Sequence, residues 1–326
     1  MKHPRRIFLQ FAGAAAAAPA FSRIASAQAF PTRPITIVVP FPAGGSTDAI
    51  SRIVGEPMRR SLGQPIVIEN VSGADGSIGV GRVARARPDG YTISVGAMDT
   101  HVLNGAFYSL PYDVLNDLVP ISPLVTAPAV LFARKTMPAN DLNEFIAWLK
   151  ANPNKASAGV VALAMRLITM FLQRETSAAF VLVPYRGAAP AVQDLAAGQI
   201  DLLFATPDQL PQMRAGNIKA YAVTSDRRLT AAPDVPTFAE MGLAALSFPD
   251  WFGIFAPKGT PTNIIGKLNA AAVEALADPT VRSRFVELGF EIFPSERQTP
   301  EALGALVKAD AEKWWPIIKE FGIKAE

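Results

Sequence analysis

The sequence predicts an α/β fold of two lobes, each a mainly parallel sheet flanked by helices. First, a β-branched apolar strand at residues 35–39 runs into prolines, glycines and a helical pattern. Second, strand, small-residue loop and helix recur in both halves of the chain. Third, the chain has 326 residues, of which 50% are hydrophobic, and approaches the size at which one core divides into two.

The N-terminus has the pattern of an export signal over residues 1–27. An arginine pair, Arg5 and Arg6, precedes an apolar run at residues 11–21, and small residues stand at the cleavage spacing. Paired arginines followed by Phe-Leu are typical of the twin-arginine signal, and a general secretory signal is the alternative. The run is too short to span a membrane, so we expect cleavage near Ala27, export and no membrane anchor.

Removal of this signal changes the charge and narrows the candidate chemistry. Four basic residues and no acidic one are lost, so the formal charge falls from +3 to −1 and no basic stripe for nucleic acid remains. The absence of cysteine excludes disulfides, thiolate metal sites and a lipid-modified cysteine. Only His101 of two histidines remains, which makes a metal site or a histidine-dependent triad hard to assemble. We expect no cofactor.

The first strand leads into a glycine loop and a helix. In Pro-Phe-Pro-Ala-Gly-Gly (residues 40–45), proline ends the strand because it cannot donate to a ladder, and the glycines leave their amides uncovered. Ser46 or Thr47 can cap the helix. A helix start suits a carboxylate or phosphate, so we expect an anion site; the alternative is a turn that only reverses the chain. The loop matches neither a P-loop nor a G-x-G-x-x-G fingerprint.

Two further loops are expected to face the same crevice. A second glycine loop, residues 70–76, follows the next strand, and a polar loop at residues 97–104 follows the third. Neighbouring parallel strands of an open sheet bring such loops to one edge, where α/β proteins bind ligands. Asp99, Thr100 and His101 either point into this crevice or satisfy their own loop's backbone.

The spacing of apolar residues, together with the prolines and glycines that interrupt it, predicts the remaining strands and helices. Strands are expected at residues 66–69, 91–96, 130–133, 156–161, 181–184, 200–204, 218–224 and 251–256. The first helix is expected to begin at Ser46 or Thr47 and to end before Gly63, and further helices are expected at residues 77–86, 141–150, 163–174, 190–197, 261–277, 279–288 and 300–321. Residues 130–133 are interpreted as the first crossing between lobes, and residues 205–208 as a third crevice edge. Arg186 is either a carboxylate clamp or a solvated arginine beside a buried tyrosine.

Eight passages, in order, carry a family resemblance. They are Pro-Phe-Pro-Ala-Gly-Gly-Ser-Thr-Asp (40–48), Glu-Asn-Val-Ser-Gly-Ala-Asp-Gly-Ser-Ile-Gly (69–79), Pro-Asp-Gly-Tyr-Thr (88–92), Leu-Pro-Tyr-Asp (110–113), Val-Pro-Tyr-Arg-Gly (183–187), Gly-Gln-Ile-Asp (198–201), Asp-Val-Pro-Thr (234–237) and Ala-Pro-Lys-Gly-Thr-Pro (256–261). Through nearly all of the mature chain, the sequence resembles the solute-binding proteins of tripartite tricarboxylate transporters, often called Bug proteins.

The resemblance implies a periplasmic binding protein of the Venus-flytrap type, with lobe 1 at residues 28–127 and 249–326 and lobe 2 at residues 128–248. It implies closure by a hinge at the strands that cross between the lobes, capture of a small carboxylic acid, and delivery to membrane permease subunits. A monomer is expected, because binding itself needs no second subunit.

The resemblance also implies the site. The first lobe should grip a carboxylate through backbone amides and ordered water at the two glycine loops, with Asp48 bracing the first helix. The expected ligand-binding residues are Phe41, Pro42, Ala43, Gly44, Gly45, Ser46, Asp48, Gly73, Ala74, Asp75, Gly76, Ser77, Met98, Thr100, Val161, Ala162, Tyr185, Thr206 and Asp208.

The second lobe departs from the family pattern at one place. Members usually carry small or polar residues and a histidine where this chain reads Gly-Val-Val-Ala-Leu-Ala-Met-Arg (159–166), and Met165 stands at the histidine position. We therefore expect a more apolar wall. The predicted ligand has an apolar or aromatic body and one or two carboxylates, unlike citrate.

Two alternative functions are considered. A ligand-presenting partner of a membrane sensor differs from a transport protein only in what docks on the closed form. A serine hydrolase would need Ser46 or Ser77 within hydrogen-bond reach of His101, and the chain lacks a G-x-S-x-G elbow. The sequence favours a binding protein with no catalytic residue and no metal.

Overall fold

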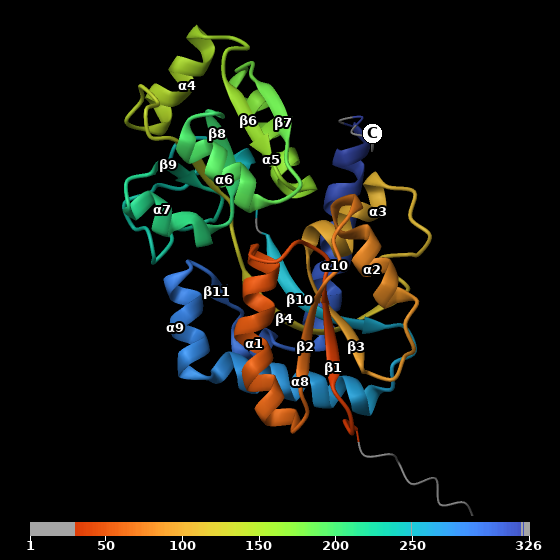
Figure 1. Ribbon diagram of the computed structural model, residues 1–326. Coiled ribbons are helices and arrows are strands. Elements are labelled where there is room, and N and C mark those ends of the chain that lie inside the picture. The colour runs from red at the N-terminus through yellow and green to blue at the C-terminus, as the bar shows by residue number, and fades with distance from the viewer. Residues whose placement is uncertain (1–29, 249, 321, 323–326) are drawn as a thin grey trace, which may run out of the picture.

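The computed structural model describes residues 30–248, 250–320 and 322, and Figure 1 shows two lobes, one above the other. Each lobe is built on one sheet, of six strands in the first lobe and five in the second. The expected α/β fold of two lobes is confirmed. The expected export signal, residues 1–27, lies outside the described residues. Within the described part of the chain, no helix combines the length and apolarity needed to cross a membrane.

The sheet of the first lobe carries helices on both faces (Figure 1). Its strands are β1 (Ile35–Val39), β2 (Ile66–Asn70), β3 (Thr92–Ala97), β4 (Leu118–Thr126), β10 (Trp251–Pro257) and β11 (Glu291–Ile292), in the order β11-β4-β10-β3-β1-β2. One face is covered by α1 (Ser46–Leu62), α8 (Thr262–Ala277) and α9 (Pro279–Glu287), the other by α2 (Ser77–Ala84), α3 (Asn104–Phe107) and α10 (Pro300–Glu320). β1 is parallel to β2 and β3, whereas β10 is antiparallel to β3 and β4.

The second sheet repeats this plan. Its strands are β5 (Val130–Arg134), β6 (Ser157–Val160), β7 (Val181–Pro184), β8 (Leu202–Ala205) and β9 (Ile218–Val223), in the order β7-β6-β8-β5-β9. One face is covered by α4 (Leu142–Ala151) and α5 (Leu163–Thr176), the other by α6 (Ala188–Ala197) and α7 (Leu210–Arg214). β6 is parallel to β7 and β8, and β5 is antiparallel to β8 and β9. In each sheet, therefore, the strand that the chain enters from the other lobe is antiparallel to both neighbours: β10 in the first sheet and β5 in the second.

The prediction of a polar loop at residues 97–104 is wrong. These residues form a buried π-helical turn, Asp99–Leu103, that continues into α3. Thr100 and His101 are satisfied internally, because His101 lies 3.1 Å from Ser94 Oγ through Nε2 and 2.8 Å from Thr100 Oγ1 through Nδ1. With these partners Thr100 and His101 need no solvent and are part of the core.

The two crossings are tied to each other by one buried side chain. Thr224 Oγ1 accepts a hydrogen bond from the Ala129 amide at 2.8 Å and donates to the carbonyl oxygen of Phe248 at 2.9 Å. The first segment runs from β4 to β5 and the second leads back into β10. The division into lobes at residues 128 and 248 stays a prediction.

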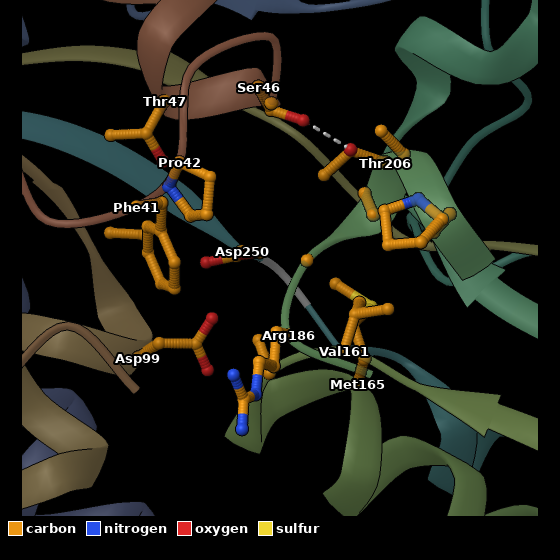
Figure 2. Close-up of a pocket in the computed structure, with 18 of the residues that line it drawn as sticks. Phe41, Pro42, Ser46, Thr47, Asp99, Val161, Met165, Arg186, Thr206 and Asp250 are labelled. Atoms are coloured by element: carbon orange, nitrogen blue, oxygen red, sulfur yellow. Dashed lines mark hydrogen bonds between the residues drawn. The ribbon is translucent and has the colours of Figure 1, made fainter. Parts of the chain in front are cut away.

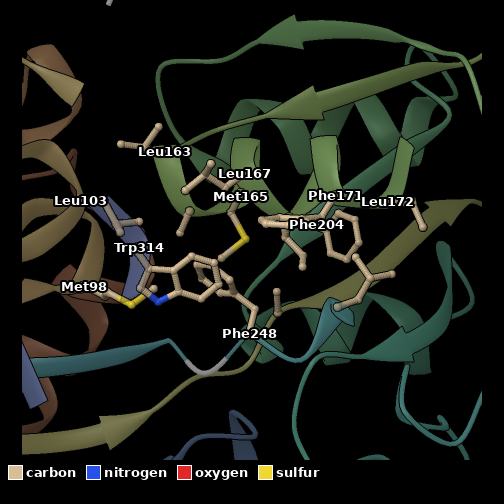
Figure 3. Close-up of a cluster of buried hydrophobic side chains, with 14 of the residues drawn as sticks. Met98, Leu103, Leu163, Met165, Leu167, Phe171, Leu172, Phe204, Phe248 and Trp314 are labelled. Carbon is tan, nitrogen blue, oxygen red and sulfur yellow. The ribbon is translucent and has the colours of Figure 1, made fainter. Parts of the chain in front are cut away.

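An apolar cluster beside the crossings contains residues of both lobes (Figure 3). The Trp314 ring of α10 lies 4.6 Å from the Phe248 ring and 6.2 Å from the Phe171 ring of α5, centroid to centroid. Met98 and Met165 belong to the same cluster. Rotation of one lobe against the other must therefore repack this cluster as well as the crossings.

Gly96 in β3 gives a test of this packing. A Cβ added there would overlap the buried imidazole of His101, whose ring stacks on Phe255 at 4.1 Å. We expect Gly96→Ala to lower the free energy of unfolding by about 1–3 kcal/mol in urea denaturation, because the ring has no space to move. Gly266→Ala in α8 is the control: its Cβ meets open space, and helix propensity predicts a gain of about 0.5–1 kcal/mol. A Gly96→Ala protein with unchanged stability would contradict this packing.

Candidate ligand-binding site

A pocket of about 290 Å³ lies between the two lobes, where loops that follow strands of both sheets meet (Figure 2). The first lobe contributes residues that follow β1 and β3 and the start of β10. The second lobe contributes residues that follow β6, β7 and β8. The pocket thus occupies the crevice at the carboxyl ends of parallel strands, where open α/β sheets bind ligands.

Asp48 holds the first glycine loop against the sheet. Its Oδ2 accepts hydrogen bonds from the Gly44 amide at 3.0 Å and from Arg52 Nε at 2.9 Å, and its Oδ1 accepts one from Asn70 Nδ2 at 3.1 Å. Asn70 also donates to the carbonyl oxygen of Phe41 at 3.0 Å, which ties the end of β2 to the loop after β1. Burial opposes ionisation of Asp48, but these hydrogen bonds outweigh it and lower its pKa.

The start of α1 forms part of the pocket wall. Gly45, Ser46 and Thr47 line the pocket, and Gly45, as the N-cap residue, has no side chain to cap the helix. The first amides of a helix have no intrahelical partner and carry partial positive charge. The Gly44 amide differs, since Asp48 already occupies it. The wall at Gly45–Thr47 is therefore the part of the loop suited to a carboxylate.

The second glycine loop lies outside the pocket wall. Asp75 Oδ2 accepts a hydrogen bond from Tyr108 Oη at 2.7 Å, and Asn104 Nδ2 donates to the Asp75 carbonyl oxygen at 2.8 Å. These contacts direct the loop toward α3. A Cβ at Gly76 would meet Thr100 and Pro40, so glycine lets this loop approach the first one closely. The second glycine loop therefore packs against the first lobe's own residues and does not line the pocket.

Two buried carboxyl groups belong to the first-lobe wall. Asp99 and Asp250 line the pocket with exposed fractions of 4% and 2%, and Figure 2 shows them opposite Val161 and Met165. Burial raises the pKa of Asp99 to about 7, since the hydrogen bond from the Ala164 amide offsets it only in part. Burial and the neighbouring charge of Asp99 raise the pKa of Asp250 well above its usual range. Asp250 was not predicted from the sequence, because β10 brings it to the site from a distant part of the chain.

The second-lobe wall is largely apolar. Val161, Ala162 and Met165, at the start of α5, line the pocket as the departure from the family pattern suggests. The exposed Arg186 also lines it. Tyr185 does not line the pocket, and its hydroxyl donates to Asp194 Oδ2 at 2.6 Å. This wall suits the hydrocarbon part of a ligand, with one cation beside it.

Hydrogen bonds join the lobes on two sides of the pocket. Ser46 Oγ of the first lobe lies 2.6 Å from Thr206 Oγ1 of the second, and both hydroxyls donate to the Asp208 carboxylate, at 3.0 and 2.7 Å. The Ala164 amide of α5 donates to Asp99 Oδ1 at 2.5 Å, so the first lobe caps a helix of the second. Burial raises the pKa of Asp208 despite its hydroxyl partners. These contacts hold the crevice closed.

Comparison with known proteins decides the family. The family model described as "Tripartite tricarboxylate transporter family receptor" (TctC) matches residues 50–323. The chain belongs to this family. The periplasmic binding protein BugD has a TM-score of 0.86 at 36% identity, with 91% of this receptor and 100% of BugD covered. MatC (Rpa3494) from Rhodopseudomonas palustris, with bound malate, scores 0.84 at 37% identity and 89% and 100% coverage. R. palustris Rpa4515 with adipate scores 0.85 at 32% identity and 90% and 99% coverage.

These findings confirm the resemblance to periplasmic Bug proteins and exclude the hydrolase alternative, because the family consists of solute receptors. The geometry of the receptor agrees. His101 is bonded to Ser94 and Thr100, and neither Ser46 nor Ser77 is among its hydrogen-bond partners in the described residues. Burial lowers the pKa of His101 to about 3, which keeps the imidazole neutral. Within the same residues no group of three or more His, Cys, Asp or Glu side chains is placed to hold a metal ion.

The structure brings part of the expected site together. The expected residues that line the receptor's pocket are Phe41, Pro42, Ala43, Gly45, Ser46, Val161, Ala162 and Thr206. Those that do not line it are Gly44, Asp48, Gly73, Ala74, Asp75, Gly76, Ser77, Met98, Thr100, Tyr185 and Asp208. Asp208 instead holds the lining residue Ser46 through a hydrogen bond, and Asp48 holds Gly44, which stands between the lining residues Ala43 and Gly45. Lining residues that the sequence did not single out as ligand contacts include Thr47, Asp250, Phe252 and Ala205.

Proposed function

We propose that this receptor captures a small carboxylic acid with an apolar body in the pocket between its lobes. The start of α1 without a side-chain cap, at the pocket wall, is the observation that carries the proposal. Arg186 adds a cation, and Val161, Ala162 and Met165 add an apolar wall. MatC with malate and Rpa4515 with adipate support the carboxylate.

We further propose that the receptor is exported by a twin-arginine signal, acts as a monomer, and delivers its ligand to permease subunits of a tripartite transporter. The family supports the transporter as the partner. Hinge motion at the crossings near residues 126–130 and 250–253 accompanies capture, with Pro249 outside the described residues. Delivery to a membrane sensor is the alternative. Uptake that stops when the permease genes are deleted supports transport, and a response that persists without them supports sensing.

A thermal-shift screen against mono-, di- and tricarboxylates, aliphatic and aromatic, tests the ligand class. A ligand at 100 times its Kd adds about 2.7 kcal/mol to the folded state, so the melting temperature should rise by several degrees. Val161→Thr, which puts a hydroxyl into the apolar wall, should weaken binding of the best acid several-fold. Val183→Thr, in β7 outside the pocket, is the matched control. Citrate binding far more tightly than any apolar-bodied acid would refute the apolar body.

A further inference from the structure

Asp99 and Asp250 reach the pocket together because of strand register. In the antiparallel pair of β3 and β10, Ala97 lies opposite Phe252. Asp99 stands two residues after Ala97, at the start of the π-helical turn that follows β3, and Asp250 stands two residues before Phe252, immediately before β10. The two carboxyl groups therefore leave the sheet at the same point, and both line the pocket.

Neither carboxyl group has a cationic partner among the described residues. The ion pairs there include neither side chain, and the hydrogen bonds they accept come from backbone amides, those of Ala164, Trp251 and Met98. Arg186 lines the same pocket but is exposed and pairs with neither. Two buried carboxyl groups that share a pocket without a countercharge are costly to ionise, since burial penalises an unpaired charge heavily.

We propose that the pocket takes an aminocarboxylate, whose protonated nitrogen lies against Asp99 and Asp250. This inference rests on the proposed function, in which the carboxylate of the ligand lies at the start of α1. An ammonium group supplies the missing countercharge and donates up to three hydrogen bonds to the two acceptors. The hydrocarbon part then lies against Val161 and Met165. A plain dicarboxylate offers no positive charge that would stabilise the ionised form of the two aspartates.

Calorimetric titration of the cleaved receptor with matched pairs tests the inference. The pairs are L-leucine and 4-methylpentanoate, L-phenylalanine and 3-phenylpropanoate, and 6-aminohexanoate and hexanoate. We expect the aminated member of at least one pair to bind tenfold or more tightly than its partner. Asp250→Asn should remove this preference while the deaminated acid binds at least as well as before. Asp234→Asn is the control, because Asp234 is exposed and lies outside the pocket.

The outcomes separate this inference from the proposed function. If every deaminated acid binds as tightly as its aminated partner, or more tightly, the aminocarboxylate is refuted and the carboxylate receptor stands. If a preference exists but survives both Asp99→Asn and Asp250→Asn, the assignment to these side chains is refuted. If neither aminated nor plain acids bind, the proposed function fails together with the inference. Asp99→Asn repeats the test should Asp250→Asn fail to fold by circular dichroism.

Discussion

Asp48→Ala is expected to lower the free energy of unfolding of the receptor by about 3 kcal/mol and to weaken ligand binding at least tenfold. The carboxylate is buried and accepts hydrogen bonds from Gly44, Arg52 and Asn70. A hydrogen bond contributes about 0.5–1.5 kcal/mol, and about 1.5–3 kcal/mol when one partner is charged. Without the Asp48 carboxylate the first glycine loop loses its fixed conformation. Ligand binding must then order the amides at the start of α1, which lowers the affinity.

Urea denaturation and calorimetry with the best acid of the screen measure the two effects. Arg52→Ala is the matched control, because Arg52 is 55% exposed and gives Asp48 only one of its hydrogen bonds. An exposed ion pair contributes little, so this variant should lose less than about 1 kcal/mol and keep its affinity. Equal affinities of Asp48→Ala and the unmodified receptor would show that the loop conformation does not depend on Asp48.

The ligand-free receptor is expected to be more stable near pH 5 than near pH 7.5. Burial raises the pKa of Asp99 to about 7 and raises those of Asp250, Asp310 and Asp208 as well. Between the usual carboxyl pKa and these raised values, the folded state binds more protons than the unfolded state. Stability therefore falls as pH rises through this window, by about 1.4 kcal/mol per pH unit for each excess proton.

The charged groups that face these carboxyls determine how steeply the free energy of unfolding changes with pH. Asp75 and Asp250 face Asp99, and Asp99 and Asp310 face Asp250, so removal of one charge should lower the pKa of its neighbour. Asp250→Asn should flatten the profile of unfolding free energy between pH 5 and 7.5, and the exposed Asp234→Asn should not. A stability that rises with pH across this range would refute the buried, unpaired state of the cluster.

Carboxylates with lowered pKa act in the opposite direction at lower pH. Hydrogen bonds to Arg52, Gly44 and Asn70 lower the pKa of Asp48. Its contribution is present above the unfolded pKa and is lost as pH falls through the folded value, below about pH 4. The stability maximum should therefore lie between these two windows.

Local signals in the sequence were sufficient for the elements that build the site. Proline, glycine and β-branched residues mark β1, the first glycine loop and α1 within one short stretch, and the structure has them there. The acidic first turn and the Asp141 N-cap likewise mark α4. Such signals need only neighbouring residues, so a single sequence contains them.

Features that depend on distant pairing were missed. Pro120 and Pro123 suggest no strand, yet both lie within β4. Their partners in β10 are Phe255 and Gly253, and the register shifts on either side of Gly253–Ile254 show how the ladder accommodates residues that cannot donate. The position of Asp250 in the site also depends on distant pairing, since the pairing of β10 with β3 brings it beside Asp99.

The hydrogen bonds that join the lobes have a consequence for unloading. Two of these hydrogen bonds must break before the crevice opens, one from the Ser46 hydroxyl to Asp208 and one from the Ala164 amide to Asp99. At about 0.5–1.5 kcal/mol each, they favour the shut form by roughly five- to 150-fold, whatever the cargo contributes. Cargo escape on its own is slowed by the same factor. If the receptor delivers its ligand to a permease, as proposed, we expect docking on the permease to supply the free energy that separates these contacts.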